Sequence, residues 1–233
     1  MSTLLIIILF ALMGVGFIVQ MRLKSKFKKY SKIAIASGLS GREVALKMLS
    51  DFGITSVTVQ SVPGKLTDHY NPVDKTVNLS PEVYNGRSVA AAAVAAHECG
   101  HAVQHATAYA WLGLRSKMVP VVSFSGKIMN IMFLFMIFGA FIAPSLISYS
   151  TILMILIVTQ AAITAFTIVT LPVEYDASNR ALAWLRTAGV TGQAEHEQAE
   201  DALKWAARTY LVAALAAITS LAYYIMLFLG NRD

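Results

Sequence analysis

The chain has 233 residues, of which 56% are hydrophobic and only 14% are charged, and this composition is too apolar for an ordinary soluble domain of that length. The net charge of +6 comes from basic residues that gather beside apolar stretches, where they face anionic lipid headgroups, so nucleic acid is not needed to explain them. The single cysteine, Cys99, excludes an intrachain disulfide framework. The sequence therefore predicts a membrane protein.

Four stretches are apolar enough to cross a bilayer, or nearly so, because a spanning helix needs about 20 mostly apolar residues. They cover residues 4–19, 118–142, 146–171 and 210–229. No lysine or arginine precedes the first stretch, and no convincing small-residue cleavage site follows it. We therefore interpret it as a retained anchor rather than a secretory signal.

The segment after the first span is strongly basic, with six lysines and arginines between residues 22 and 32. The positive-inside rule then predicts that the chain begins outside the cell and is cytoplasmic from residue 22 onward. The remaining spans put residues 143–145 and the tail outside and return residues 172–208 to the cytoplasm. A topology signal with some headgroup attraction explains the basic run, and we prefer it to a specific binding role.

The first helix expected after the anchor opens at a capping box formed by Ser40 and Glu43, runs to about Asp51, and ends at Gly53. Residues 33–115 as a whole have the pattern of a small α+β unit.

Two strands are expected next. In residues 56–62, β-branched side chains alternate with other residues, and residues 76–79 repeat the pattern after the turn-rich stretch 68–74. These two segments are therefore predicted to form a β-hairpin. Asn85 or Ser88 then caps a long helix with an alanine-rich beginning.

That long helix carries an HExxH motif, formed by His97, Glu98 and His101. Residues four apart share a helix face, so both imidazoles can converge on one metal ion, and Glu98 lies beside it, placed to take a proton from metal-bound water. The ligands suit Zn²⁺. We prefer this interpretation to two ordinary helix histidines.

His105 continues the same face, but it lies eight residues beyond His97, about 12 Å along the axis, which is too far to share one tetrahedral zinc ion. We expect His105 either to hydrogen-bond a metal-binding side chain without touching the metal or to pack as a polar residue. Cys99 is rotated by about 200° from His97, so it should point away from the metal and pack as a small apolar group.

A catalytic zinc ion usually has three protein ligands, so the third must come from elsewhere in the chain. The segment after the third span carries Glu174 and Asp176 on the same side of the membrane as the histidines, with Pro172 suited to a helix first turn and Gly189 to its end. We expect Glu174 to be the third ligand. Asp176 could orient a ligand imidazole. Alternatively, both acids only complement the dipole at the helix N-terminus.

The HECGH helix, the DHYNP turn at residues 68–72, the TVNLS strand after it and LPVEYDAS at residues 171–178 resemble the YugP-type putative neutral zinc metallopeptidases of bacterial membranes. The resemblance spans nearly the whole chain and implies a multi-pass protein of the bacterial cell membrane. More distantly, the arrangement is similar to HtpX-like and CAAX-processing membrane gluzincins, in which HExxH and a downstream Glu bind zinc. Those relatives usually carry Asp four residues after that Glu. Here Ser178 holds that position, so the roles of Ser178 and Asp176 stay open.

The predicted activity is zinc-dependent endopeptidase cleavage at the cytoplasmic membrane surface, with Glu98 as general base and peptides or membrane proteins as substrates. The edge of the predicted hairpin is suited to holding an extended substrate. One further donor is needed to stabilise the oxyanion, and each candidate is more readily structural than catalytic. The candidates are His69, Tyr70, Tyr175 and Arg180.

The main rival is a catalytically silent membrane scaffold with a structural zinc site, which has no use for Glu98. A transporter ranks lower, because the spans between residues 118 and 171 contain only one charged residue, Lys127. The sequence does not define an oligomeric state.

The expected fold class is a mainly α membrane protein with about four transmembrane helices and a small cytoplasmic α+β zincin-like unit, which contains the β-hairpin and the HExxH helix. The chain is expected to divide into an N-terminal anchor at residues 1–21, the zincin-like unit at 22–117, two transmembrane helices at 118–171, a cytoplasmic helical segment with the third ligand at 172–209, and a last transmembrane helix at 210–233.

Overall fold

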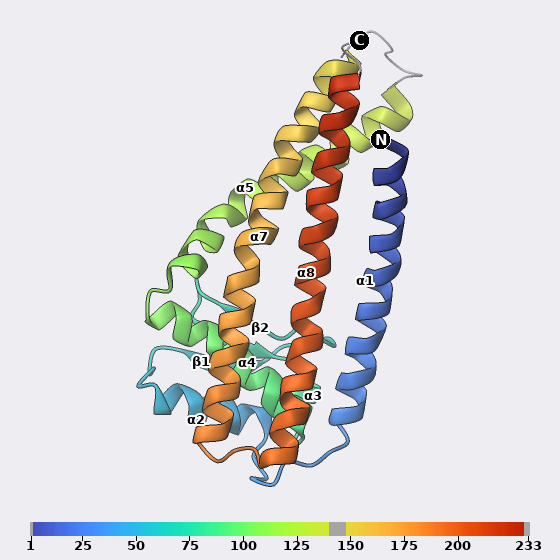
Figure 1. Ribbon diagram of the computed structural model, residues 1–233. Coiled ribbons are helices and arrows are strands. Elements are labelled where there is room, and N and C mark those ends of the chain that lie inside the picture. The colour runs from blue at the N-terminus through green and yellow to red at the C-terminus, as the bar shows by residue number, and fades with distance from the viewer. Residues whose placement is uncertain (1, 140–147, 231–233) are drawn as a thin grey trace. The chain divides into compact units, whose positions relative to one another are not determined.

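The computed structural model describes residues 2–139 and 148–230. Four long helices dominate the described residues and are apolar and long enough to cross a membrane: α1 (Ser2–Tyr30), α5 (Ala110–Leu134, continued by the π-helical turn η1, Phe135–Gly139), α7 (Tyr149–Thr187) and α8 (Gln193–Gly230) (Figure 1). The expectation of a mainly helical protein with four such helices is confirmed. The expected turn at 143–145 lies outside the described residues.

The chain forms two compact units. The first comprises Met1–Ile18, Leu114–Leu171 and Tyr210–Asp233, and the second comprises Val19–Gly113 and Pro172–Thr209.

The first unit holds the apolar parts of the long helices. Leu153 and Leu156 of α7 pack with Met132 of α5 in a small buried cluster. Two polar side chains of α7, Gln160 and Thr164, donate hydrogen bonds to the backbone oxygen of Ala217 in α8, at 3.2 and 3.1 Å. Such side-chain bonds join helices where water is absent.

The second unit contains the shorter helices α2 (Gly41–Asp51), α3 (Pro81–Tyr84) and α4 (Val89–Ala106). The capping box of α2 is present as predicted, since Ser40 Oγ accepts from the Glu43 amide while the Glu43 carboxylate accepts from the Ser40 amide. Ser88, rather than Asn85, caps α4, and its Oγ accepts from the Ala91 amide at 3.2 Å. The alanine-rich start of α4 is buried, and α4 packs against α2.

The predicted hairpin has the wrong strand partners. The three-stranded sheet has the order β1-β3-β2, in which β1 (Thr58–Ser61) runs parallel to β3 (Thr76–Leu79), while β2 (His69–Asn71) is antiparallel to β3. The stretch expected to be only a turn contains β2, and the tight turn follows it, with Asn71 Oδ1 accepting from the Val73 amide at 2.9 Å. Side-chain alternation identifies a strand but not its neighbour, so the pattern missed the crossover from β1.

Pro172 was expected in the first turn of a helix, and this is also wrong. It lies inside α7, which continues from the apolar stretch through residue 187. Proline removes one backbone donor from a helix, but it does not end a helix that neighbouring turns and packing support. The change from apolar to polar composition at this point is therefore not a change of secondary structure. Gly189, with φ of +64°, follows the end of α7 as expected.

Candidate metal centre

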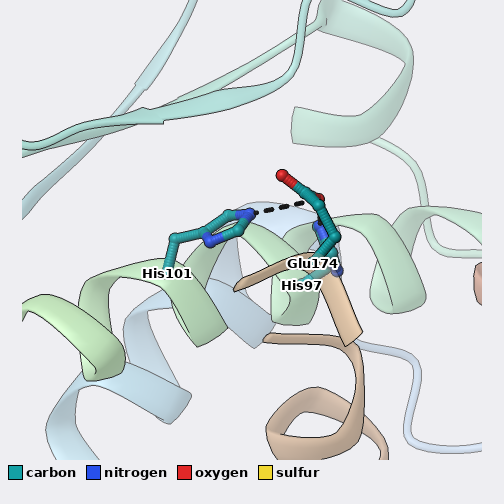
Figure 2. A group of neighbouring side chains, drawn as sticks. All are labelled: His97, His101 and Glu174. Carbon is teal, nitrogen blue, oxygen red and sulfur yellow. Dashed lines mark ion pairs between the residues drawn. The ribbon is translucent and has the colours of Figure 1, made fainter. Parts of the chain in front are cut away.

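His97 and His101 lie on successive turns of α4, as residues four apart on a helix must. Their ring centroids are 4.9 Å apart and the rings are nearly perpendicular, at 83°. His101 is buried, and His97 is half-buried. Both rings project from the same face of α4 (Figure 2).

Glu174 reaches these rings from α7, the element that follows the third apolar stretch (Figure 2). Its Oε2 lies 3.3 Å from His97 Nε2 and 3.6 Å from His101 Nε2, and the carboxylate is almost completely buried. One atom from each residue can serve as a ligand, and these atoms all lie within 4.8 Å of one another. Two imidazoles and one carboxylate are a donor set found in catalytic zinc sites, so the residues present suit this ion.

The ring of His101 is held in one tautomer by Gln104, which is fully buried. Gln104 Nε2 donates to the Val173 backbone oxygen and to Asp176 Oδ2, both at 2.8 Å. Because both partners only accept, the orientation of the amide is fixed and its oxygen faces His101 Nδ1 at 3.0 Å. His101 Nδ1 must therefore donate, so the neutral ring has its lone pair on Nε2, the nitrogen that faces Glu174.

His97 has a similar support from Ser178, whose Oγ lies 3.1 Å from His97 Nδ1. Ser178 is four residues after Glu174, so one face of α7 supplies both the carboxylate and the hydroxyl. Hydrogen bonds at the second ring nitrogen fix the orientation of metal-binding imidazoles in general.

The electrostatic environment of His101 favours positive charge. Burial lowers the pKa of its imidazole, but the hydrogen bond and charge of Glu174, together with the charge of Glu98, outweigh burial and raise the pKa above its ordinary value. The negative charge of two carboxylates thus acts on the buried His101 ring and stabilises a cation there.

Glu98 is buried beside the two histidines, with 8% of its surface exposed. The neighbouring thiol of Cys99 lies on a different face of α4, with Sγ 3.6 Å from the Ala45 backbone oxygen of α2. Burial, and then the charge of Glu98, raise the pKa of this thiol. Cys99 therefore packs as a neutral group, away from the cluster.

Gly100 allows the helix that carries the histidines to approach α7 closely. A Cβ atom at this position would lie 2.5 Å from the Ala177 backbone oxygen, a distance that no side chain tolerates without a backbone shift. The close packing of α4 against α7 therefore requires glycine at position 100, between the two histidines of the motif.

Two further predicted residues, Asp176 and Arg180, belong to the hydrogen-bond network behind His101, and other predicted residues lie outside it. Asp176 accepts from Gln104 and, at 2.6 Å, from Arg180 Nε. His105 is exposed and its Nδ1 lies 2.7 Å from the Tyr70 hydroxyl. In the described part of the chain, no hydrogen bond, ion pair or ring contact joins either His69 or Tyr175 to His97 or His101. His69 pairs with the Thr67 oxygen, and Tyr175 is 43% exposed.

Gln104 is the residue that the sequence analysis missed. It lies three residues after His101, on a neighbouring part of the same face, and a polar side chain one helical turn beyond a predicted ligand was the available signal. Its partners come from α7, which no spacing along α4 reveals.

Comparison with known proteins identifies a family for the chain. Residues 4–229 match the family described as "Putative neutral zinc metallopeptidase". The chain is 39% identical over 230 residues to the "Putative membrane protease YugP" of Bacillus subtilis (strain 168), and the match covers 99% of each chain. No solved structure matches the chain.

Proposed function

The chain belongs to the putative neutral zinc metallopeptidase family, and we propose that it is a membrane-embedded zinc-dependent endopeptidase that hydrolyses peptide bonds at the cytoplasmic membrane surface. One observation carries the proposal. Ligand atoms of His97, His101 and Glu174, brought together from two helices, lie within 4.8 Å of one another.

In this proposal the three residues hold Zn²⁺ through both Nε2 atoms and the Glu174 carboxylate. When bound, the ion supplies the Lewis acidity that activates water and polarises the scissile carbonyl. Gln104 and Ser178 hold the two rings with Nε2 directed inward. Glu98 takes the proton from the attacking water and returns it to the leaving amine.

The position of Glu174 along α7 supports a substrate at the membrane surface. Glu174 follows Leu171, the end of the apolar stretch, by three residues, or about 4.5 Å of helix. The bilayer headgroup layer is thicker than this distance, so a bond cleaved here belongs to a membrane protein or to a tail lying close to the bilayer. β2 is an edge strand of the sheet and packs against α4, so we assign it the binding of an extended substrate segment.

The test uses full-length protein purified in mild detergent without chelators, compared with its Glu98→Gln variant. We expect about one zinc ion per chain in both proteins. Cleavage of membrane-protein substrates should fall by about 10²- to 10⁴-fold in the variant, because it lacks the general base. Glu197→Gln, which removes an exposed acid from α8, is the matched control and should cleave normally.

The outcomes separate the proposal from its rival. Zinc bound to a wild-type protein that cleaves no substrate would favour the silent scaffold with a structural metal site. Protein that binds no zinc at all would overturn both interpretations.

A further inference from the structure

A large groove lies in the second unit, lined by residues of α1, by the connection before β2, and by the segment that leads into α4. Its volume is about 950 Å³. Five cationic side chains line it against one carboxylate, Glu82. The cations are Lys24, Lys28, Lys32, Lys65 and Arg87. None of these residues belongs to the candidate metal centre, and the proposed peptidase chemistry does not use them.

The cations of the groove differ in whether protein groups already neutralise them. Lys65 pairs with Glu82 at 2.8 Å, and Arg87 pairs with Glu43 at 3.0 Å. Within residues 2–139 and 148–230, no acidic side chain pairs with the three other lysines, which are all exposed. The unpaired positive charge of the groove therefore comes from α1 and the turn after it.

The three unpaired lysines are spaced by four residues, so they share one face of α1 and the turn that continues it. Lys26 lies on another face and is neutralised by Asp201 of α8, at 2.8 Å. Lys29 lies over the ring of Tyr30, 5.5 Å from its centroid. A basic run that served only as a topology signal would not need this division between lysines bound by other elements of the fold, as Lys26 is, and lysines gathered around a concave surface.

The groove begins at the depth of lipid headgroups. Lys24 follows Val19, the end of the first apolar stretch, by five residues, or about 7.5 Å along α1. The headgroup layer extends about 5 to 8 Å beyond the hydrocarbon core. Lys28 is one turn further out, and its long side chain can reach back towards the same layer.

Apolar groups complete the lining. Phe27 and Leu66 face the groove between the cations. A ligand that combines a phosphate with an apolar body suits this mixture better than an inorganic ion does, because the aromatic and aliphatic surfaces gain nothing from a fully hydrated anion.

We propose that this groove binds the phosphate headgroup of an anionic phospholipid, held by Lys24 and Lys28 and flanked by Phe27 and Leu66. The inference is independent of the proposed peptidase activity, since its readout is lipid binding.

The test measures individual lipid binding to the full-length protein in neutral detergent micelles by native mass spectrometry. Phosphatidylglycerol is the anionic probe and phosphatidylcholine the neutral one. The groove variant is Lys24→Gln/Lys28→Gln. Its matched control, Arg22→Gln/Lys29→Gln, removes the same charge from the same helix outside the groove.

We expect the wild-type protein to prefer phosphatidylglycerol by about tenfold, the groove variant to lose about tenfold in affinity for it, and the control to change by about twofold or less. Equal losses in the two variants would show diffuse attraction by the whole basic run and would overturn the proposal. Soluble sn-glycerol 3-phosphate is the third probe. If it bound as tightly as the lipid, the ligand would be a soluble phosphate ester and the lipid assignment would be wrong.

Discussion

All the hydrogen bonds of the Gln104 side-chain amide serve to orient one imidazole, that of His101. Its two donor bonds anchor it to Val173 and Asp176 of α7, and its oxygen receives the Nδ1 hydrogen of His101. Arg180 in turn binds Asp176 at 2.6 Å. A chain of hydrogen bonds therefore runs from the half-exposed Arg180 to the buried ring of His101, and removing one member leaves polar groups unsatisfied in a dry environment.

Replacing Gln104 with Ala should weaken zinc binding by about 10- to 100-fold, because His101 loses the acceptor that keeps its Nε2 lone pair available. Competition with a coloured chelator at neutral pH measures this affinity in the purified protein. His105→Ala is the control on the same helix, since its exposed ring contacts Tyr70 and should leave zinc affinity unchanged. Equal affinities for wild type and Gln104→Ala would show that Gln104 only fills space.

At the level of single residues, the sequence predicts the members of the cluster better than their supports. His97 and His101 follow from helical periodicity, and Glu174 follows from topology, which places it on the same side of the membrane. Ser178 and Gln104 could not be assigned, because their hydrogen bonds cross between α4 and α7 and depend on the rotation of each helix.

Between elements, the contact of α4 with α7 brings the three ligand residues together. Gly100 sits where the backbones of α4 and α7 approach each other closely. Since the site draws ligands from both helices, any change that separates them by a fraction of an ångström acts on the distances between ligands.

Gly100→Ala should therefore destabilise the protein by about 1–3 kcal/mol, as overpacking does, and should lower zinc occupancy as well. Thermal unfolding in detergent, followed together with metal content, measures both. Gly113→Ala is the matched control, because a Cβ there meets nothing within 4 Å. This variant should not lower the stability of the protein and should instead gain from the higher helix propensity of alanine. If the two variants behaved alike, the close approach of the helices would not matter.

The capping box of α2 gives a prediction about acid stability. The backbone and side-chain hydrogen bonds from Ser40, and then the charge of Arg87, outweigh burial and hold the pKa of Glu43 below its ordinary value. A carboxyl with a depressed pKa in the folded state stabilises the fold above its unfolded pKa, and this contribution disappears as the pH falls through the folded value.

Glu43→Gln should thus lower the melting temperature at pH 7, while the difference from wild type shrinks towards zero below about pH 4. A series of melting curves between pH 7 and pH 3 tests this. A difference that stayed constant with pH would mean that the carboxylate charge is not what stabilises the cap.

Secondary structure was more predictable than the pairing of elements. The caps at Ser40 and Ser88 are local, and a short stretch of sequence contains all of their partners. The parallel pairing of β1 with β3 and the passage of α7 through Pro172 depend on contacts between distant segments, and hydropathy alternation contains no information about them.

For the whole molecule, the arrangement along α7 links the membrane to the chemistry. One continuous helix contains an apolar stretch, then Glu174, Asp176 and Ser178 within its next two turns. If α7 crosses the bilayer, a metal ligand at Glu174 has a depth set by the bilayer, and the proposed site stays close to the membrane surface. The side of the membrane on which it lies then decides which proteins are accessible as substrates.

The predicted side is cytoplasmic, and the chain is well suited to a direct test, because its single cysteine is buried and should label poorly. Val73→Cys introduces a thiol at a position that is 86% exposed in the second unit. In intact bacteria a membrane-impermeant maleimide should leave this thiol unlabelled and should label it after permeabilisation. Ser148→Cys, at an exposed position near the end of the third predicted span that is expected to lie outside, should label in intact cells. The reverse pattern would place the metal centre on the outer surface, where the basic run after the first span would contradict the positive-inside rule and the proposed substrates would have to be extracellular.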